Sequence, residues 1–220
     1  MANTKIQIVE NILSANDRIA EENQELFNSM NILAVNIMAS PGAGKTSVIL
    51  QTIRSLSPDI KIAVIEGDTA PVTIDSDKVS NLGIPVTQIN TGGDCHLDAM
   101  MVRKGLQHLE LVHTDLVIIE NVGNLICPAS FKLGTHINLV IASVPEGDDK
   151  PYKYPGIYQR IDCLILNKID LLPYVEFNQD YFRKGIEILN PGIPVFPVSC
   201  KTLEGFNAWI GWLRSRLVEK

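Results

Sequence analysis

The sequence predicts an α/β fold in which a doubly wound, mainly parallel sheet carries helices on both faces. Strand-like apolar runs alternate along the chain with helix-like segments, an order typical of parallel strands joined by helical crossovers. The runs are also nearly continuous in Val, Ile and Leu, which is typical of strands covered on both faces. No internal repeat, low-complexity tract or linker interrupts them, so we expect one domain over residues 1–220.

Seven apolar runs are the expected strands, and most segments between them are expected to be helical. The predicted strands span residues 32–38, 61–65, 85–89, 116–120, 137–143, 163–166 and 195–198. The predicted helices span residues 45–56, 73–82, 95–110, 178–190 and 203–218. Residues 4–30 place Ile12, Ile19 and Leu26 among polar residues, which favours an amphipathic helix. We expect residues 1–30 to be an N-terminal helical appendage packed on the main domain.

The composition argues against several classes of function. A net charge of −6 without a basic tract argues against nucleic acid as the main partner, because binding to a phosphate backbone requires a basic face. The polar N-terminus does not resemble a signal peptide, and no apolar run reaches the roughly 20 residues that span a bilayer. We therefore expect a cytoplasmic protein without a membrane partner, whose four cysteines form no disulfides.

A phosphate-binding loop is predicted between the first expected strand and the helix after it. The segment reads Ala39-Ser-Pro-Gly42-Ala43-Gly44-Lys45-Thr46-Ser47. Gly42 and Gly44 allow backbone N–H groups to turn towards phosphate oxygens. Lys45 should reach the β- and γ-phosphates, and the Thr46 hydroxyl should bind Mg²⁺. Alanine replaces the usual first glycine, which is tolerable if Ala39 keeps a negative φ. The strand–loop–helix context predicts a P-loop NTPase, with residues 42–47 in contact with the nucleotide.

A base-specific loop is predicted where the strand at residues 163–166 ends. Asn167-Lys168-Ile-Asp170 follows it, and ligands of such sheets lie at the carboxyl ends of the strands. The Asp170 carboxylate can accept hydrogen bonds from guanine N1–H and the exocyclic amine, donors that adenine lacks. Lys168 can lie along the purine, and Asn167 can tie the loops together. The later Ser199-Cys200-Lys201 could give a backbone N–H to guanine O6. The pair of motifs favours GTP over ATP, with Cys200 as a small loop residue.

A phosphate sensor is predicted after the strand at residues 116–120. Glu120 should lie near Mg²⁺, and the Gly123 N–H near the γ-phosphate. Asp68, after the preceding strand, is a second Mg²⁺ candidate; Asp75 and Asp77 are weaker ones. The predicted catalytic residues are Lys45, Thr46, Asp68 and Glu120, of which the last three are the Mg²⁺ ligands. Asn124 stands where some GTPases carry a water-positioning glutamine, so intrinsic hydrolysis should be slow.

Cys95, His96 and Cys127 are candidate ligands of a soft metal ion. Neighbouring Cys95 and His96 can reach one ion only at a loop or helix end, and Cys127 would come from the sensing loop, at the same carboxyl edge of the sheet if the predicted topology holds. Thiolate and imidazole suit Zn²⁺ or Ni²⁺. Water, Asp94 or a second subunit could supply a fourth ligand. The residues alone leave the alternative open that both cysteines only pack in the interior.

The remaining cysteine and histidines carry no predicted chemistry. Cys163 lies within an expected strand and should be a core residue. His108, His113 and His136 are scattered along the chain and should be surface residues or satisfied by local hydrogen bonds.

Several motifs together resemble the HypB-type hydrogenase nickel-incorporation GTPases. They are the Glu-Gly-Asp68 turn, Cys95-His96-Leu-Asp-Ala99, Glu120-Asn-Val-Gly-Asn-Leu-Ile-Cys-Pro128 and Glu146-Gly-Asp-Asp-Lys-Pro-Tyr-Lys-Tyr-Pro155. The resemblance covers nearly the whole chain from Asn31 onwards. It implies a GTP-hydrolysing metallochaperone for [NiFe] hydrogenase maturation, with GTP, Mg²⁺ and Ni²⁺ or Zn²⁺ as cofactors.

The resemblance also implies a set of partners. These are a second copy of the chain in a GTP-dependent homodimer, the hydrogenase large subunit and a zinc-containing nickel-binding accessory protein. Lys153 would approach the partner subunit's nucleotide, and Cys95, His96 and Cys127 would form a Ni²⁺ or Zn²⁺ site near the dimer interface. The alternatives are a GTPase serving urease or a cobalamin-dependent mutase, a small-molecule kinase, and a non-catalytic GTP-controlled binding module with structural zinc.

Overall fold

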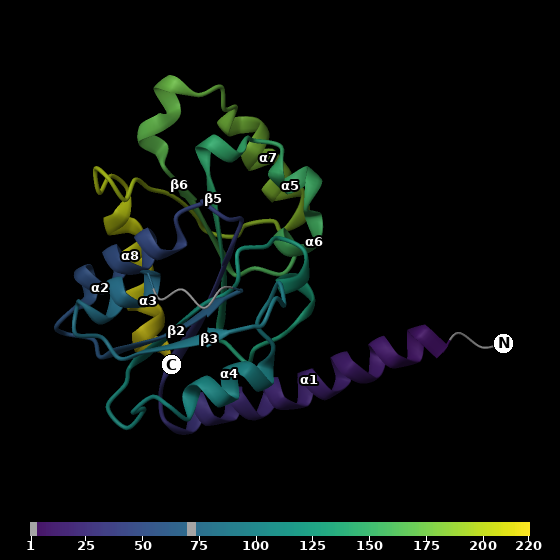
Figure 1. The fold of residues 1–220 in the computed structure, drawn as a ribbon. Helices are drawn as coiled ribbons and strands as arrows, with labels where there is room; N and C mark the ends of the chain where they lie inside the picture. Colours follow the sequence, from purple (N-terminus) through teal and green to yellow (C-terminus); the bar gives the residue numbers. More distant parts are fainter. Residues whose placement is uncertain (1–3, 70–73) are drawn as a thin grey trace.

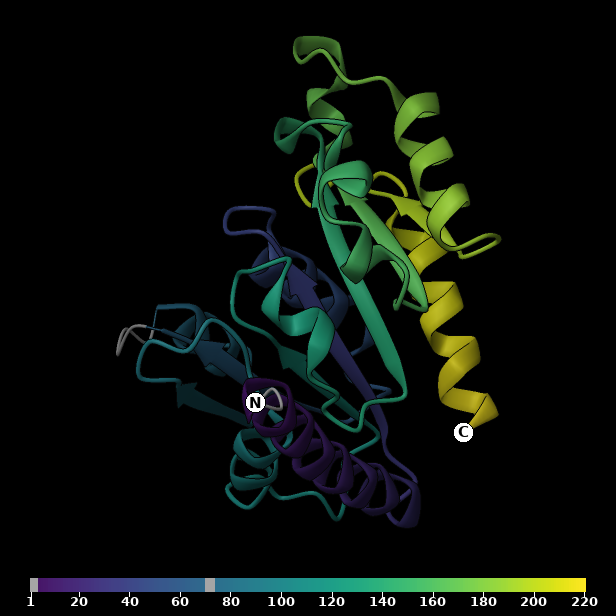
Figure 2. The same cartoon turned by 90° about the vertical axis from the view of Figure 1, so that its right-hand side faces the viewer.

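Seven parallel strands form one sheet in the computed structural model, which describes the backbone of residues 4–69 and 74–220 and the side chains of residues 12–69 and 75–220 (Figures 1 and 2). The strands are β1 (Leu33–Ala39), β2 (Ile62–Asp68), β3 (Val86–Asn90), β4 (Leu116–Glu120), β5 (Ile137–Ser143), β6 (Cys163–Asn167) and β7 (Val195–Pro197). Their order is β3-β2-β4-β1-β5-β6-β7, and every pairing is parallel. The predicted doubly wound α/β class is confirmed.

The main helices lie in the segments where the sequence predicts helices, although the bounds of α4 differ. They are α1 (Thr4–Ser29), α2 (Lys45–Leu56), α3 (Ile74–Ser80), α4 (Ala99–Leu106), α7 (Gln179–Leu189) and α8 (Phe206–Glu219). Five short helices between β4 and α7 were not predicted: η1 (Cys127–Ser130), η2 (Val144–Glu146), α5 (Lys150–Lys153), α6 (Pro155–Tyr158) and η3 (Ile169–Tyr174). Each spans six residues or fewer, too short to produce a helical period in the sequence.

Helices cover both faces of the sheet. On one face, α2 and α8 bury their apolar sides against alternate residues of the central strands, with Trp209 in the middle of the cluster. On the other face, α1 and α4 cover β2 and β4 through Phe27 and Leu106, while α6 and α7 cover β5 and β6. Figure 1 shows α1 running beneath the body beside α4, with its N-terminal end extending beyond the rest of the molecule.

The predicted helix over residues 95–110 is wrong at both ends. α4 spans only Ala99–Leu106. The Asp98 carboxylate accepts a hydrogen bond from the Met101 N–H (2.7 Å) and caps the helix, so Cys95 and His96 lie in the preceding loop. The late start matters because two neighbouring side chains diverge on a regular helix but can converge in a loop.

All candidate residues at strand ends lie along one edge of the sheet. Because the strands are parallel, the carboxyl ends of β1, β2, β4 and β6 meet at the same edge. In register, Glu120 of β4 lies beside Ile37 of β1 and beside Glu66 of β2.

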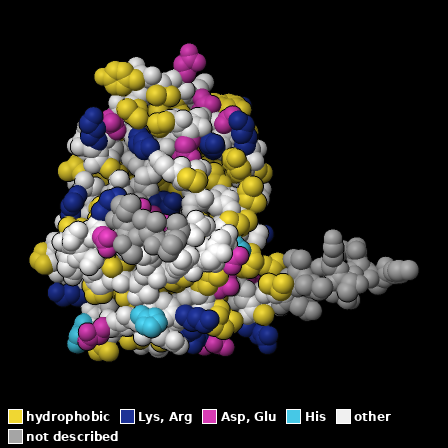
Figure 3. Space-filling model, viewed as in Figure 1, with side chains coloured by type: hydrophobic (Ala, Val, Ile, Leu, Met, Phe, Trp, Pro, Cys, Tyr) yellow, Lys and Arg dark blue, Asp and Glu magenta, His cyan; other side chains and the backbone are white. Residues whose placement is uncertain are grey.

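No helix among the described residues combines the length and the hydropathy needed to cross a membrane. On the face drawn in Figure 3, acidic and basic side chains are interspersed rather than gathered by sign.

Candidate nucleotide and metal sites

The phosphate loop joins β1 to α2 in a conformation that requires glycine. Gly42 and Gly44 have φ of 78° and 99°, values that L side chains rarely adopt. At Gly44 a Cβ atom would also lie 2.5 Å from the Asn167 Nδ2 atom, so the loop can approach β6 only without a side chain there. Ala39 is the buried last residue of β1 and has no positive φ, which is the condition under which alanine is tolerated.

Thr46 and Glu120 meet beside this loop. The Thr46 hydroxyl donates a hydrogen bond to Glu120 Oε1 (3.1 Å). Glu120 is 5% exposed, and burial raises its pKa to about 7, although Lys45 opposes the shift. The structure therefore brings together three of the four residues predicted to be catalytic.

Two further carboxylates lie on β2 next to this pair. Glu66 is 4% exposed and its Oε2 atom has no hydrogen-bond partner among the described residues. Burial, followed by repulsion from Asp75, raises the pKa of Glu66 to about 7. Asp68, half-buried at the end of β2, adds to the negative field on Glu66. Buried carboxylates and a hydroxyl are the oxygen donors that Mg²⁺ prefers, and a cation there would relieve their mutual repulsion. The donor set fits Mg²⁺.

The predicted base-specific loop lies against the phosphate loop. The Asn167 side-chain amide donates to the Ala43 carbonyl (3.0 Å), and the Lys168 ammonium donates to the Gly42 carbonyl (2.7 Å). The Ser199 hydroxyl donates to Asp170 Oδ1 (2.7 Å). Asp170 is thereby held in place with carboxylate lone pairs still available to a ligand.

A hollow of about 530 Å³ lies between these loops. Its lining includes Gly44, Ser47, Asn167, Lys168, Asp170, Cys200 and Lys201. The sequence placed each of these residues in a nucleotide site, and they surround one space. Cys200 carries a carbonyl that accepts from Gln51 (3.3 Å), and burial raises the pKa of its thiol to about 11, so the thiol stays neutral.

Cys95, His96 and Cys127 converge as the sequence predicts. One ligand atom from each lies within 4.8 Å of the other two. The two Sγ atoms are 2.7 Å apart, and Cys95 Sγ lies 3.9 Å from His96 Nδ1. All three side chains are half-buried. The His96 ring packs on Phe131, with ring centroids 3.9 Å apart. The hydrogen bond with Cys95 raises the pKa of Cys127. Asp94 is exposed and does not belong to this cluster.

Two asparagines of the sensing loop form hydrogen bonds to the Cys95–His96 loop and the residue after it. The sequence predicted neither contact. Asn121, 1% exposed, follows Glu120 directly, and its Oδ1 atom accepts from the Leu97 N–H (3.0 Å). The Asn124 amide donates to the Cys95 carbonyl (3.3 Å). The sequence did show polar residues after a buried strand, which indicated a possible role for them. It could not indicate their hydrogen-bond partners, because these lie more than twenty residues away along the chain.

The remaining predicted residues are placed as follows. Gly123 lies against the phosphate loop, where a Cβ atom would be 3.2 Å from the Pro41 nitrogen. Lys153 is exposed on α5 and forms an ion pair with Asp149. Cys163 is fully buried in the core.

The scattered histidines and the weaker Mg²⁺ candidates are also accounted for. His108 and His113 are exposed. His136 is satisfied locally: its Nδ1 atom accepts from the Ala34 N–H (3.0 Å). Asp75 forms an ion pair with Lys78 (2.6 Å), and Asp77 is exposed on α3.

Together these features define a P-loop nucleotide-binding protein with a Cys-His-Cys cluster next to its phosphate-sensing loop. Comparison with known proteins agrees. Residues 33–197 match the family model described as CobW/HypB/UreG, nucleotide-binding domain. The hydrogenase maturation factor HypB of Azotobacter chroococcum is 42% identical over 208 residues, covering 94% of this chain and 68% of the relative.

Helicobacter pylori provides both a sequence relative and a solved structure. Its hydrogenase/urease maturation factor HypB is 39% identical, covering 93% of this chain and 86% of the relative. The crystal structure of HypB from the same organism in complex with nickel superimposes with a TM-score of 0.88 at 35% identity, covering 93% of this chain and 96% of that one. The chain belongs to the CobW/HypB/UreG nucleotide-binding family and, within it, to the HypB-type hydrogenase maturation GTPases.

Proposed function

We propose that this chain is a cytoplasmic GTP-hydrolysing metallochaperone that assists nickel insertion into [NiFe] hydrogenase, working as one domain over residues 1–220. The observation that carries the proposal is the cluster of Cys95, His96 and Cys127, whose ligand atoms lie within 4.8 Å of one another beside a nucleotide loop. Two sulfur donors and one imidazole nitrogen suit Ni²⁺ or Zn²⁺. A fourth ligand would come from water or from a second subunit.

The nucleotide is GTP held with Mg²⁺. Asp170, oriented by Ser199, accepts from the guanine N1–H and amine, and Lys168 lies along the purine. The backbone of residues 42–47 and Lys45 hold the phosphates. Thr46 and Glu120, which share a hydrogen bond (3.1 Å), would hold Mg²⁺ together with Asp68, and the ion would neutralise charge during phosphoryl transfer.

Nucleotide state and metal binding are coupled through the sensing loop. Gly123 reads the γ-phosphate, and Cys127 lies in the same loop. Asn121 and Asn124 extend the connection to Leu97 and to the Cys95 carbonyl. A movement of the loop on hydrolysis would therefore displace Cys127 relative to Cys95 and His96 and change the affinity for the metal.

The proposed partners in the GTPase cycle are other proteins. We propose a GTP-dependent homodimer in which Lys153 approaches the nucleotide of the partner subunit. The hydrogenase large subunit would receive nickel, and a zinc-containing nickel-binding accessory protein would exchange it. The net charge of −6 argues against nucleic acid as a partner.

The test compares Ni²⁺ affinity with GDP and with a non-hydrolysable GTP analogue bound. We expect different affinities in the two states for the wild type, and loss of both tight binding and the difference in Cys127→Ser. Cys163→Ala is the control, because Cys163 is a cysteine buried in the core and does not belong to the metal cluster. Equal affinities in both states would reject the coupling.

Urease is a second candidate client. The reason is the relative named hydrogenase/urease maturation factor HypB in Helicobacter pylori, since the same nickel chemistry serves both enzymes. Cells lacking this chain should lose hydrogenase activity and regain it with excess nickel. A parallel loss of urease activity in cells that contain urease would add the second client.

A further inference from the structure

Helix α1 crosses both chain segments that carry the candidate metal ligands. Asn16 and Asn23 lie two turns apart on the face of α1 that packs on the body. Asn16 Oδ1 accepts from the Ala99 N–H (2.9 Å), and Asn16 Nδ2 donates to the Lys132 carbonyl (2.9 Å). Asn23 Nδ2 donates to the carbonyls of Ala99 (2.9 Å) and Leu133 (3.1 Å). Each asparagine thus bridges the same two segments.

These anchor points follow closely on the ligands. Ala99 comes three residues after His96, at the start of α4, and Lys132 follows Cys127 through the short helix η1. The Ala99 N–H is a first-turn group without an intrahelical acceptor, so Asn16 supplies the bond that it lacks. The two bridges therefore act on the backbone of both halves of the metal cluster.

The asparagines are built into this position rather than resting on the surface. Asn16 and Asn23 are 7% and 0% exposed. Asn23 Oδ1 also accepts from Arg103 Nε (2.7 Å), so its amide is used at both ends. At Gly134 a Cβ atom would lie 2.2 Å from the Ala20 carbonyl oxygen, which means that the loop packs directly on the α1 backbone.

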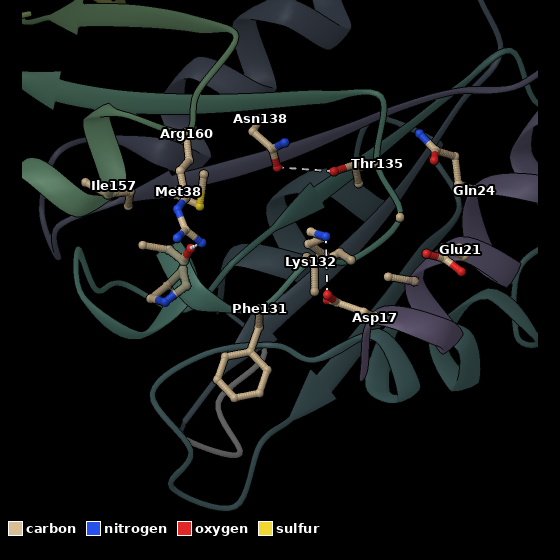
Figure 4. Close-up of a pocket in the computed structure, with 15 residues that line it drawn as sticks. Asp17, Glu21, Gln24, Met38, Phe131, Lys132, Thr135, Asn138, Ile157 and Arg160 are labelled. Carbon is tan, nitrogen blue, oxygen red and sulfur yellow. Dashed lines mark hydrogen bonds and ion pairs between the residues drawn. The ribbon is translucent and has the colours of Figure 1, made fainter. Parts of the chain in front are cut away.

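A cavity lies next to the hydrogen bonds that Asn16 and Asn23 form. It has a volume of about 530 Å³ and lies between α1 and the loop after Cys127 (Figure 4). In Figure 4, Asp17 of α1 faces Lys132 across it, and the two form an ion pair (3.2 Å). The contact between α1 and the loop thus combines buried amide bridges with a polar hollow, and the bridges supply its directional bonds.

We propose that Asn16 and Asn23 are positioning residues for the metal site: they hold the Cys95–His96 loop and the Cys127 segment at the separation that the metal requires. A displacement of α1 then loosens the metal site directly. The inference rests on the proposed function, in that it takes the Cys-His-Cys cluster as the metal site. It adds a second control to that site, which acts through α1 and its bonds to Ala99, Lys132 and Leu133.

The test uses Asn16→Ala and Asn23→Ala in the full chain, with Asn28→Ala as the matched control. Asn28 is also an α1 asparagine bonded to the body, but its partner is His136 (2.9 Å), outside the two ligand segments. Ni²⁺ affinity and the sulfur-to-nickel charge-transfer band are measured by titration. Reaction of the metal-free protein with a trivalent arsenical that bridges two thiols reports the spacing of Cys95 and Cys127 without any metal.

We expect Asn16→Ala and Asn23→Ala to weaken Ni²⁺ binding roughly 10-fold, the usual effect of removing a group that orients metal ligands. Both variants should also alter the charge-transfer band and slow the bridging of the two thiols by the arsenical. Asn28→Ala should match the wild type in Ni²⁺ affinity, charge-transfer band and bridging rate. Asn16→Asp keeps the acceptor for Ala99 but loses the donor to Lys132, and should weaken binding as Asn16→Ala does. It provides a second variant should Asn23→Ala fail to fold, which thermal melting would detect.

Three results would overturn the inference. The first is wild-type affinity, band and bridging rate in both Asn16 variants, and the second is an equal loss in Asn28→Ala. The third is wild-type binding in Asn16→Asp, because a bridge needs both of its bonds. Failure of the proposed function looks different: Ni²⁺ binding by the wild type would then be absent, or would persist unchanged in Cys127→Ser.

Discussion

Gly67 is the position where one added methyl group should disturb both the fold and the metal site. It lies in β2 and is buried. A Cβ atom there would be 2.7 Å from Leu97 Cγ and 2.8 Å from both of its terminal carbons. Carbon atoms pack best at roughly 3.5–4.0 Å, so Gly67→Ala overlaps the Leu97 side chain by most of an ångström. Leu97 is fully buried and cannot turn into solvent.

The expected cost follows from this overlap. Overpacking a filled core costs about 1–3 kcal/mol of unfolding free energy, and we expect Gly67→Ala within that range. Leu97 follows His96 directly and hydrogen-bonds through its N–H to Asn121 (3.0 Å). A shift of Leu97 should therefore also move His96 and weaken Ni²⁺ binding.

Chemical denaturation of the single and double variants measures the contact. Leu97→Ala alone should cost about 2–5 kcal/mol through the cavity that it leaves. In Gly67→Ala/Leu97→Ala the new methyl group enters that cavity, so the loss should fall short of the sum by about 1 kcal/mol or more. Gly211→Ala is the control: nothing lies within 4 Å of its Cβ position in α8. It should stabilise the fold by roughly 0.5–1 kcal/mol through helix propensity.

The reasoning is refuted by either of two results. One is a cost of Gly67→Ala below about 0.5 kcal/mol, the range of a neutral surface change. The other is strict additivity in the double variant, because additive losses would mean that the new methyl group and Leu97 do not meet.

Further predictions concern pH, base specificity and hydrolysis. Burial, then the Lys220 charge, lower the pKa of His136, so the stability that it supports is complete above its ordinary pKa of about 6.5 and declines as pH falls towards its folded-state pKa. Denaturation at about pH 7.5 and about pH 5.5 should show a larger loss for the wild type than for His136→Gln; equal losses would contradict this. Asp170→Asn should weaken GTP binding roughly 10- to 100-fold and improve that of xanthosine triphosphate, whose carbonyl at C2 can accept from the amide; competition against labelled GDP tests both, and unchanged GTP affinity would exclude the carboxylate contact. Asn124 is engaged with the Cys95 carbonyl (3.3 Å) and the Ile126 N–H (3.0 Å), so single-turnover hydrolysis without a partner should be slow, and a rapid rate would count against that role.

The strands were predictable because their signal is local. Seven apolar runs correspond to the seven observed strands, with β4 and β5 matching to the residue. The bounds of the helix predicted at residues 95–110 were not predictable, because the helix starts where the Asp98 carboxylate accepts a hydrogen bond from the Met101 N–H. The short helices between β4 and α7 escaped prediction because chain segments of that length take their shape from the surfaces on which they pack.

The candidate site likewise has parts that the sequence predicts and parts that it does not. The segments 39–47 and 167–170 carry their chemistry in the sequence itself, and the parallel sheet brings them to one edge. Asn121 and Asn23 carry no such pattern, since an asparagine acquires a role only through the groups that it meets.

By itself the sequence determined the α/β class, the order of strands and loops along the chain, and which residues could bind phosphate, guanine and a soft metal. Those properties follow from apolar periodicity and from the chemistry of neighbouring residues. Only the tertiary structure decided that Cys95, His96 and Cys127 converge within 4.8 Å, and that buried asparagines from α1 and from the sensing loop hold their two segments. Such contacts join residues far apart in the chain, and the hydrogen bonds of buried amides are set by what the folded core places beside them.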